Sequence, residues 1–136
     1  SNTLQIGKNQ VRPSFKRERY TISFIRQKNT ITKETIPLLQ ILDAIRYIKK
    51  IPDSTVESSC KRLLSIIKKL SNQDKDTLVR LALKYPPATR ALVGALLDEL
   101  QKSTLTESLY KTLNPITKYK LAGATTLKTA EKWNIV

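Results

Sequence analysis

The chain contains 136 residues, of which 25 are Lys or Arg and 11 are Asp or Glu, so its formal net charge is +14. It has no histidine and a single cysteine, Cys60, which excludes an internal disulfide and the usual zinc and imidazole-base sites. No run of 18 uncharged apolar residues occurs. We therefore expect a cytoplasmic protein with no transmembrane helix, no cofactor, no small-molecule substrate and no enzymatic activity.

The excess of positive charge predicts a polyanion as partner: nucleic acid, a membrane surface or an acidic protein. A well-solvated basic surface without a ligand is the alternative. The chain also lacks methionine, even at its first position, so we expect it to be part of a longer protein.

Residues 1–33 have the pattern of a small antiparallel β unit. Leu4 and Ile6 alternate with polar residues ahead of a turn, which predicts a short strand followed by a basic connector. Residues 19–26 are the clearest strand, because aromatic and β-branched side chains dominate and alternate there.

Half of the net charge lies in this first stretch, where eight basic residues and one acidic residue give +7 through residue 33. Phe15 and Tyr20 are interleaved with the basic residues, and such mixtures can hold phosphates and stack bases. A hydrophobic core is the alternative role for Tyr20 and Phe24, which share one strand face. A bound nucleic acid could also use the charges alone.

From Thr35 onward, apolar residues recur at helical spacing. Capping residues and prolines divide this part of the chain into about five predicted helices. The first runs to residues 49–50, and the second runs from a cap at Asp53 or Ser54 to residue 70. The third begins after a capping Ser71 and stops before residues 85–86. The fourth covers residues 87–100, and a shorter helix capped by Ser103 or Thr104 ends at residues 114–115.

The helix expected over residues 87–100 is apolar around most of its circumference, so the other helices should pack around it. Arg90, Gly94 and Asp98, spaced four apart, form a thin polar stripe along it. Glycine inside a helix costs about 1 kcal/mol relative to alanine. We therefore expect Gly94 to admit the close approach of a neighbouring backbone.

Residues 114–136 show no sustained period, but they contain the only tryptophan, Trp133, whose size favours docking against the core. The predicted fold class is therefore α+β. It comprises a β unit at residues 1–33, a helical core at 34–113 and an irregular docked tail at 114–136, in a single domain of residues 1–136.

Four segments, residues 36–53, 81–100, 114–121 and 131–135, resemble the C-terminal domain of AbiEi-type antitoxins, regulators of abortive-infection loci. The basic strand at residues 19–26 fits the opening of that domain. The resemblance implies a two-domain protein in which a winged helix, absent here, binds the operator and the C-terminal domain carries antitoxin activity and assists repression. It also implies a nucleotidyltransferase-like toxin encoded nearby, without a need for a stable complex. A positively charged face would help to hold DNA, and its candidates here are Lys16, Arg17, Arg19, Arg26 and Lys28.

The leading hypothesis is thus a bacterial antitoxin and transcriptional regulator that grips operator DNA through phosphate contacts. A protein-interaction module is the second hypothesis; it would use an apolar groove beside the central helix or the tail around Trp133. An RNA-binding module is the third, because the same charge permits it.

Overall fold

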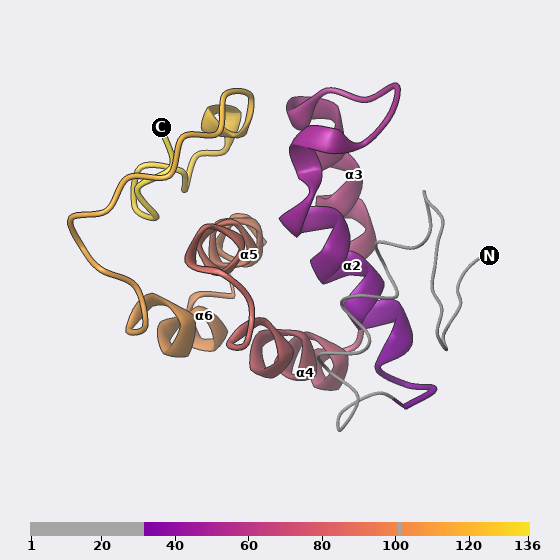
Figure 1. Cartoon of the computed structure of the whole chain (residues 1–136). Helices are drawn as coiled ribbons and strands as arrows, with labels where there is room; N and C mark the ends of the chain where they lie inside the picture. Colours follow the sequence, from indigo (N-terminus) through magenta and orange to yellow (C-terminus); the bar gives the residue numbers. More distant parts are fainter. Residues whose placement is uncertain (1–31, 101) are drawn as a thin grey trace. The chain divides into compact units, whose positions relative to one another are not determined.

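The structure is a computed structural model that describes residues 32–100 and 102–136 (Figure 1). The chain divides into two compact units, residues 1–43 and 44–136, with the boundary inside helix α2. The predicted single domain over residues 1–136 stays a prediction. The elements in chain order are α2 (Ile36–Arg46), η2 (Ile48–Lys50), α3 (Val56–Lys68), α4 (Asn72–Ala82), α5 (Pro87–Glu99), α6 (Ser103–Tyr110) and η3 (Ala124–Thr126).

The predicted α+β class is wrong, because the described ranges contain helices and no strand. Their only strand-like pairing is an isolated parallel bridge between Tyr119 and Ile135. Most of the expected β unit, including the strand at residues 19–26, lies outside the described residues. At its expected end the chain is already turning into α2, because the N–H groups of Thr35 and Ile36 both donate to the Thr32 carbonyl at 3.1 Å. These bonds satisfy the backbone locally, so residues 32–36 form a helical turn and no strand.

In the first unit, the described residues form this turn and the start of α2. Leu38, Leu39 and Leu42 are at most 2% exposed and recur at helical spacing, so one face of the helix is buried. Pro37 lies in the first turn, where its missing N–H costs no intrahelical bond. The prediction of a helix after Thr35 is confirmed.

Helices α3 and α4 belong to the second unit, and side-chain caps fix where each begins. The hydroxyl of Ser71 accepts a bond from the Asp74 N–H at 3.0 Å, as predicted for α4. The cap of α3 is Thr55, which forms a reciprocal capping box with Ser58. Asp53 or Ser54 had been expected there, but Asp53 has a left-handed φ of 57°, so it belongs to the preceding turn.

Helix α5 is the centre of the second unit (Figure 1). Pro87 occupies its first turn, and every residue from 91 to 97 is buried. It contacts α3, α4 and α6, which confirms that the other helices pack around it. Because α5 is buried on nearly all sides, packing holds the residues at its two ends in place.

The C-terminal tail docks against α5, as predicted. Trp133 is 1% exposed, and its indole and the Tyr110 ring form a T-shaped pair with centroids 5.0 Å apart. A Cβ atom built on Gly94 would overlap the six-membered ring of Trp133. The expectation that a backbone approaches Gly94 is therefore wrong: glycine leaves the space that this indole fills.

Candidate functional site

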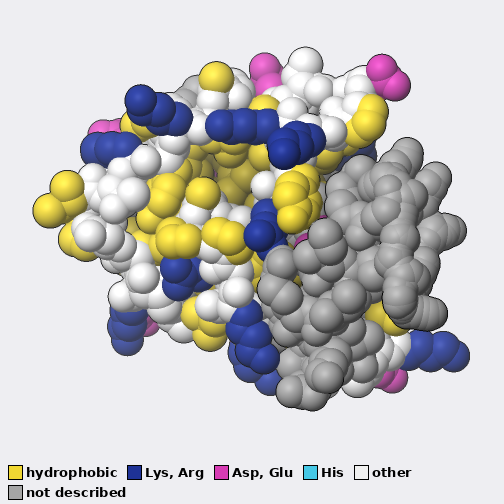
Figure 2. All heavy atoms as spheres, in the orientation of Figure 1, with side chains coloured by type: hydrophobic (Ala, Val, Ile, Leu, Met, Phe, Trp, Pro, Cys, Tyr) yellow, Lys and Arg dark blue, Asp and Glu magenta, His cyan; other side chains and the backbone are white. Residues whose placement is uncertain are grey.

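A groove of about 540 Å³ opens between the end of α2, the start of α5 and the C-terminal tail. All of its lining residues belong to the second unit. Figure 2 shows hydrophobic side chains at the bottom of a hollow on this face and Lys and Arg side chains along its upper edge. The lining is formed by residues 45–50, by Pro86, Ala88, Thr89 and Leu92, and by residues 118–121 with Ile135.

The floor of the groove is apolar. Ile45, Ile48, Leu92 and Ile135 line it, and each is at most 4% exposed. Tyr47 and Tyr119 also line the groove and are of intermediate exposure, so each is partly buried and partly accessible. An apolar floor with a few polar groups above it is the usual composition of a binding groove.

The rim of the groove carries charge of one sign. Its lining residues include Arg46, Lys49, Lys50, Lys118 and Lys120, and no Asp or Glu among the described residues lines it. In the part of the chain that the structure describes, the ion pairs join Lys61 to Glu57, Arg80 to Asp76 and Lys132 to Asp98, and none uses a rim residue. Like charges gathered over a low-dielectric floor raise the local potential and attract anions.

Two of the rim groups have a second explanation. Lys49 and Lys50 lie in the last turn of η2, just after α2, where cations complement the helix dipole. Lys118 and Lys120 lie in extended chain, where no helix end accounts for them. These two lysines therefore carry the argument for an anionic ligand.

Hydrogen bonds between the two ends of the tail hold Lys118 and Lys120 in place. The Tyr119 N–H donates to the Asn134 carbonyl at 2.8 Å, and the Val136 N–H donates to the Tyr119 carbonyl at 2.9 Å. A third bond runs from the Leu121 N–H to the Val136 carbonyl at 2.8 Å. Side chains alternate in extended backbone, so Tyr119 is half-buried while the flanking lysines are exposed.

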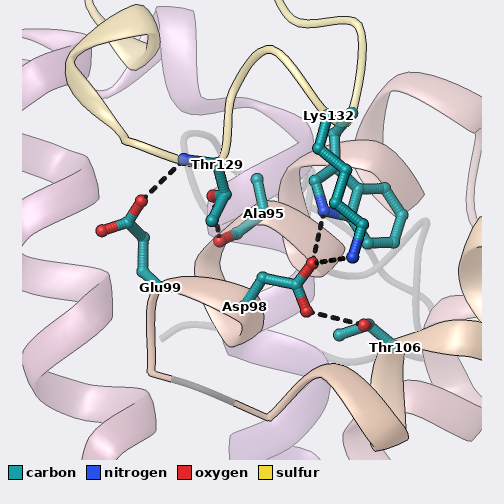
Figure 3. Close-up of polar contacts among 7 residues, drawn as sticks. Ala95, Asp98, Glu99, Thr106, Thr129 and Lys132 are labelled. Atoms are coloured by element: carbon teal, nitrogen blue, oxygen red, sulfur yellow. Dashed lines mark hydrogen bonds and ion pairs between the residues drawn. The ribbon is translucent and has the colours of Figure 1, made fainter.

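A polar cluster at the C-terminal end of α5 anchors residues 129–133 of the tail (Figure 3). The Asp98 carboxylate accepts bonds from the Thr106 hydroxyl at 2.7 Å and the Trp133 indole N–H at 2.9 Å, and it pairs with Lys132 at 2.8 Å. Next to it, the Thr129 N–H donates to Glu99 and the Thr129 hydroxyl donates to the Ala95 carbonyl. Of the predicted polar stripe, Asp98 bonds the tail directly and Gly94 leaves space for the Trp133 ring.

The environment of Asp98 favours its charged form. Burial pushes its pKa upward, but the hydrogen bonds from Lys132, Thr106 and Trp133 and the charge of Lys132 outweigh burial, so the pKa is lowered. Asp98 therefore has a structural role as a charged carboxylate, which binds Thr106, Lys132 and Trp133.

The five residues predicted to bind nucleic acid, Lys16, Arg17, Arg19, Arg26 and Lys28, all lie outside the described residues and stay a prediction. The rim residues were missed. The signal was present as Lys49-Lys50 and as Lys118-Tyr119-Lys120, but nothing in the sequence indicated that these two segments meet.

Cys60 does not form part of a reactive site. It is 1% exposed, and burial raises the pKa of its thiol. Across residues 32–100 and 102–136, no group of three or more Asp, Glu, Cys or His side chains comes together to suit a metal ion.

Within the same ranges, no helix has the length and apolar character needed to cross a bilayer. Comparisons of the chain with models of protein families, with curated proteins and with solved structures give no match.

Proposed function

We propose that this chain is a non-catalytic nucleic-acid-binding module, the C-terminal domain of a bacterial, cytoplasmic antitoxin and transcriptional regulator of the AbiEi type. The nucleic-acid part of this proposal is supported by the groove rim, where the residues that the structure describes contribute five cations and no carboxylate. The antitoxin part is supported by the resemblance of residues 36–53, 81–100, 114–121 and 131–135.

Phosphates suit this rim better than a bilayer does. A membrane surface is contacted by cations and apolar side chains that project together, whereas here the apolar residues lie at the bottom of a groove under the lysines. A phosphodiester chain is narrow enough to reach a recessed site, and each phosphate that it brings neutralises one cation.

Salt-titrated binding of duplex DNA tests the proposal. Replacing Lys118 and Lys120 by glutamine should reduce the slope of log K against log[salt] by about 1.8, since each lost phosphate contact removes about 0.9. The matched control replaces Lys61 and Lys128, which lie outside the groove, and removes the same charge. Identical slopes for the two double variants would contradict phosphate binding at the rim.

The sequence-predicted residues are tested in the same assay. Replacing Arg17 and Arg19 by glutamine should also flatten the salt dependence if the first basic stretch contacts phosphates. If the slope of log K against log[salt] is unchanged, these residues do not contact phosphates, and the groove is the phosphate-binding surface.

A protein-interaction module is the second candidate, favoured by two exposed apolar side chains: Ile116 is 81% exposed and Tyr110 47%. Trp133 is not available as an anchor, because it is buried. Capture of the neighbouring nucleotidyltransferase-like toxin, lost in Ile116→Asp and kept in Lys118→Gln, would favour this candidate.

A further inference from the structure

We propose that the groove binds unpaired nucleotides of a single strand, with a base against the apolar floor and the flanking phosphates at the basic rim. The inference rests on the proposed function, because it takes the partner to be nucleic acid, and it adds which form of nucleic acid enters the groove.

The apolar floor is the first reason. A duplex hides the faces of its bases in the stack and offers a protein its phosphates, sugars and base edges. A duplex lying across the rim would leave the apolar surface inside the groove in contact with water. An unpaired base has an accessible aromatic face, and its entry into the groove removes that face from water.

The two tyrosines are the second reason. Tyr47 and Tyr119 line the groove from different segments, and both are partly accessible. Single-strand sites combine such aromatic rings with a positively charged groove, because every base can stack whatever its identity. The guanidinium of Arg46 lies 5.3 Å from the centre of the Tyr47 ring, so a cation already accompanies this stacking surface.

The start of α5 supplies hydrogen-bond donors at the same place. No side chain caps this end, and the first N–H groups of a helix lack intrahelical partners. The Thr89 side chain also lines the groove. Its hydroxyl can donate a hydrogen bond to a phosphate oxygen that enters there.

An acidic peptide with an aromatic side chain is the competing ligand. The whole-chain charge favours nucleic acid, because +14 far exceeds the five rim cations that a short peptide could cover. A strand that continues beyond the groove can neutralise basic residues elsewhere on the chain.

The test compares labelled probes of about eight nucleotides, a length within the range of known single-strand sites. The probes are oligothymidine, oligouridine, a blunt duplex of equal length, an oligomer with abasic sugars and polyglutamate of equal charge. Either single strand should bind at least about five-fold tighter than the duplex or the abasic oligomer. The difference between the two reports the combined effect of the 2′-hydroxyl and the C5 methyl group of thymine.

Two variants locate the contact. Tyr47→Ala should weaken single-strand binding at least about five-fold, whereas Tyr47→Phe, which keeps the ring, should bind like the parent. Thr89→Val, which keeps the shape of the side chain, should also weaken single-strand binding. Circular dichroism checks that each variant is folded, and the comparison of oligothymidine with the abasic oligomer on the parent protein decides the matter if Tyr47→Ala does not fold.

The outcomes separate the two proposals. Salt-dependent duplex binding that equals single-strand binding would overturn the inference and leave the proposed function standing. Absence of binding to every nucleic acid would overturn both. Polyglutamate that binds as tightly as oligothymidine would replace the inference with an acidic peptide ligand.

Discussion

Replacing Gly94 by alanine adds one methyl group, which raises the helix propensity of α5 but disturbs its packing against Trp133. In an isolated helix the change would stabilise by about 1 kcal/mol. In this protein the added methyl group would overlap the ring of Trp133, which is 1% exposed. The rigid indole is held by its N–H bond to Asp98 and by the edge of Tyr110, so it has little freedom to move aside.

The magnitude follows from these contacts. Overpacking a core by one methyl group costs typically 1–3 kcal/mol, and complete loss of a buried tryptophan costs about 3–5 kcal/mol. The hydrogen bond to the Asp98 carboxylate contributes about 1.5–3 kcal/mol more if it breaks. After the gain in helix propensity is subtracted, we expect Gly94→Ala to lower the free energy of unfolding by about 2 kcal/mol.

Urea denaturation followed by circular dichroism measures this change, and fluorescence reports the cause, because Trp133 is the only tryptophan. Gly94→Ala should shift the emission to longer wavelength as the indole leaves its site. The double-mutant cycle with Trp133→Ala is the control: once the ring is absent, Gly94→Ala should stabilise by about 1 kcal/mol. Stabilisation by that amount in both backgrounds, with unchanged emission, would refute the packing argument.

Two further predictions concern titratable groups in the same unit. The folded pKa of Asp98 is lowered, so its carboxylate stabilises the fold fully above the unfolded value near 3.9, and this contribution is lost as the pH falls through the folded pKa. The difference in Tm between the parent and Asp98→Asn should therefore shrink below about pH 4, and parallel Tm–pH curves would contradict it. Burial raises the pKa of Cys60, so a thiol reagent at pH 8 should label it only at the rate at which the protein opens. A small-molecule thiol gives the reference rate of labelling. Labelling in native buffer as fast as in urea would show that the Cys60 thiol is accessible and would contradict this prediction.

Helix positions were predictable because they depend on local chemistry. Ser71 caps α4, Pro87 opens α5, and the apolar period of residues 91–97 marks the central helix. Each of these signals acts within one or two turns of its own residue. The choice of α+β failed because strand pairing depends on partners elsewhere in the chain.

The groove and the tail anchor were decided by tertiary structure alone. Gly94 predicted a close approach, but only packing identified the Trp133 ring as what approaches. The rim joins Lys49 to Lys120 across most of the second unit, and surface lysines follow no period that would reveal such a meeting. Local sequence therefore located the helices and their buried faces to within a few residues, because these follow from neighbouring residues, although the cap of α3 proved to be Thr55. The gathering of distant cations around one apolar floor followed from how those buried faces pack together.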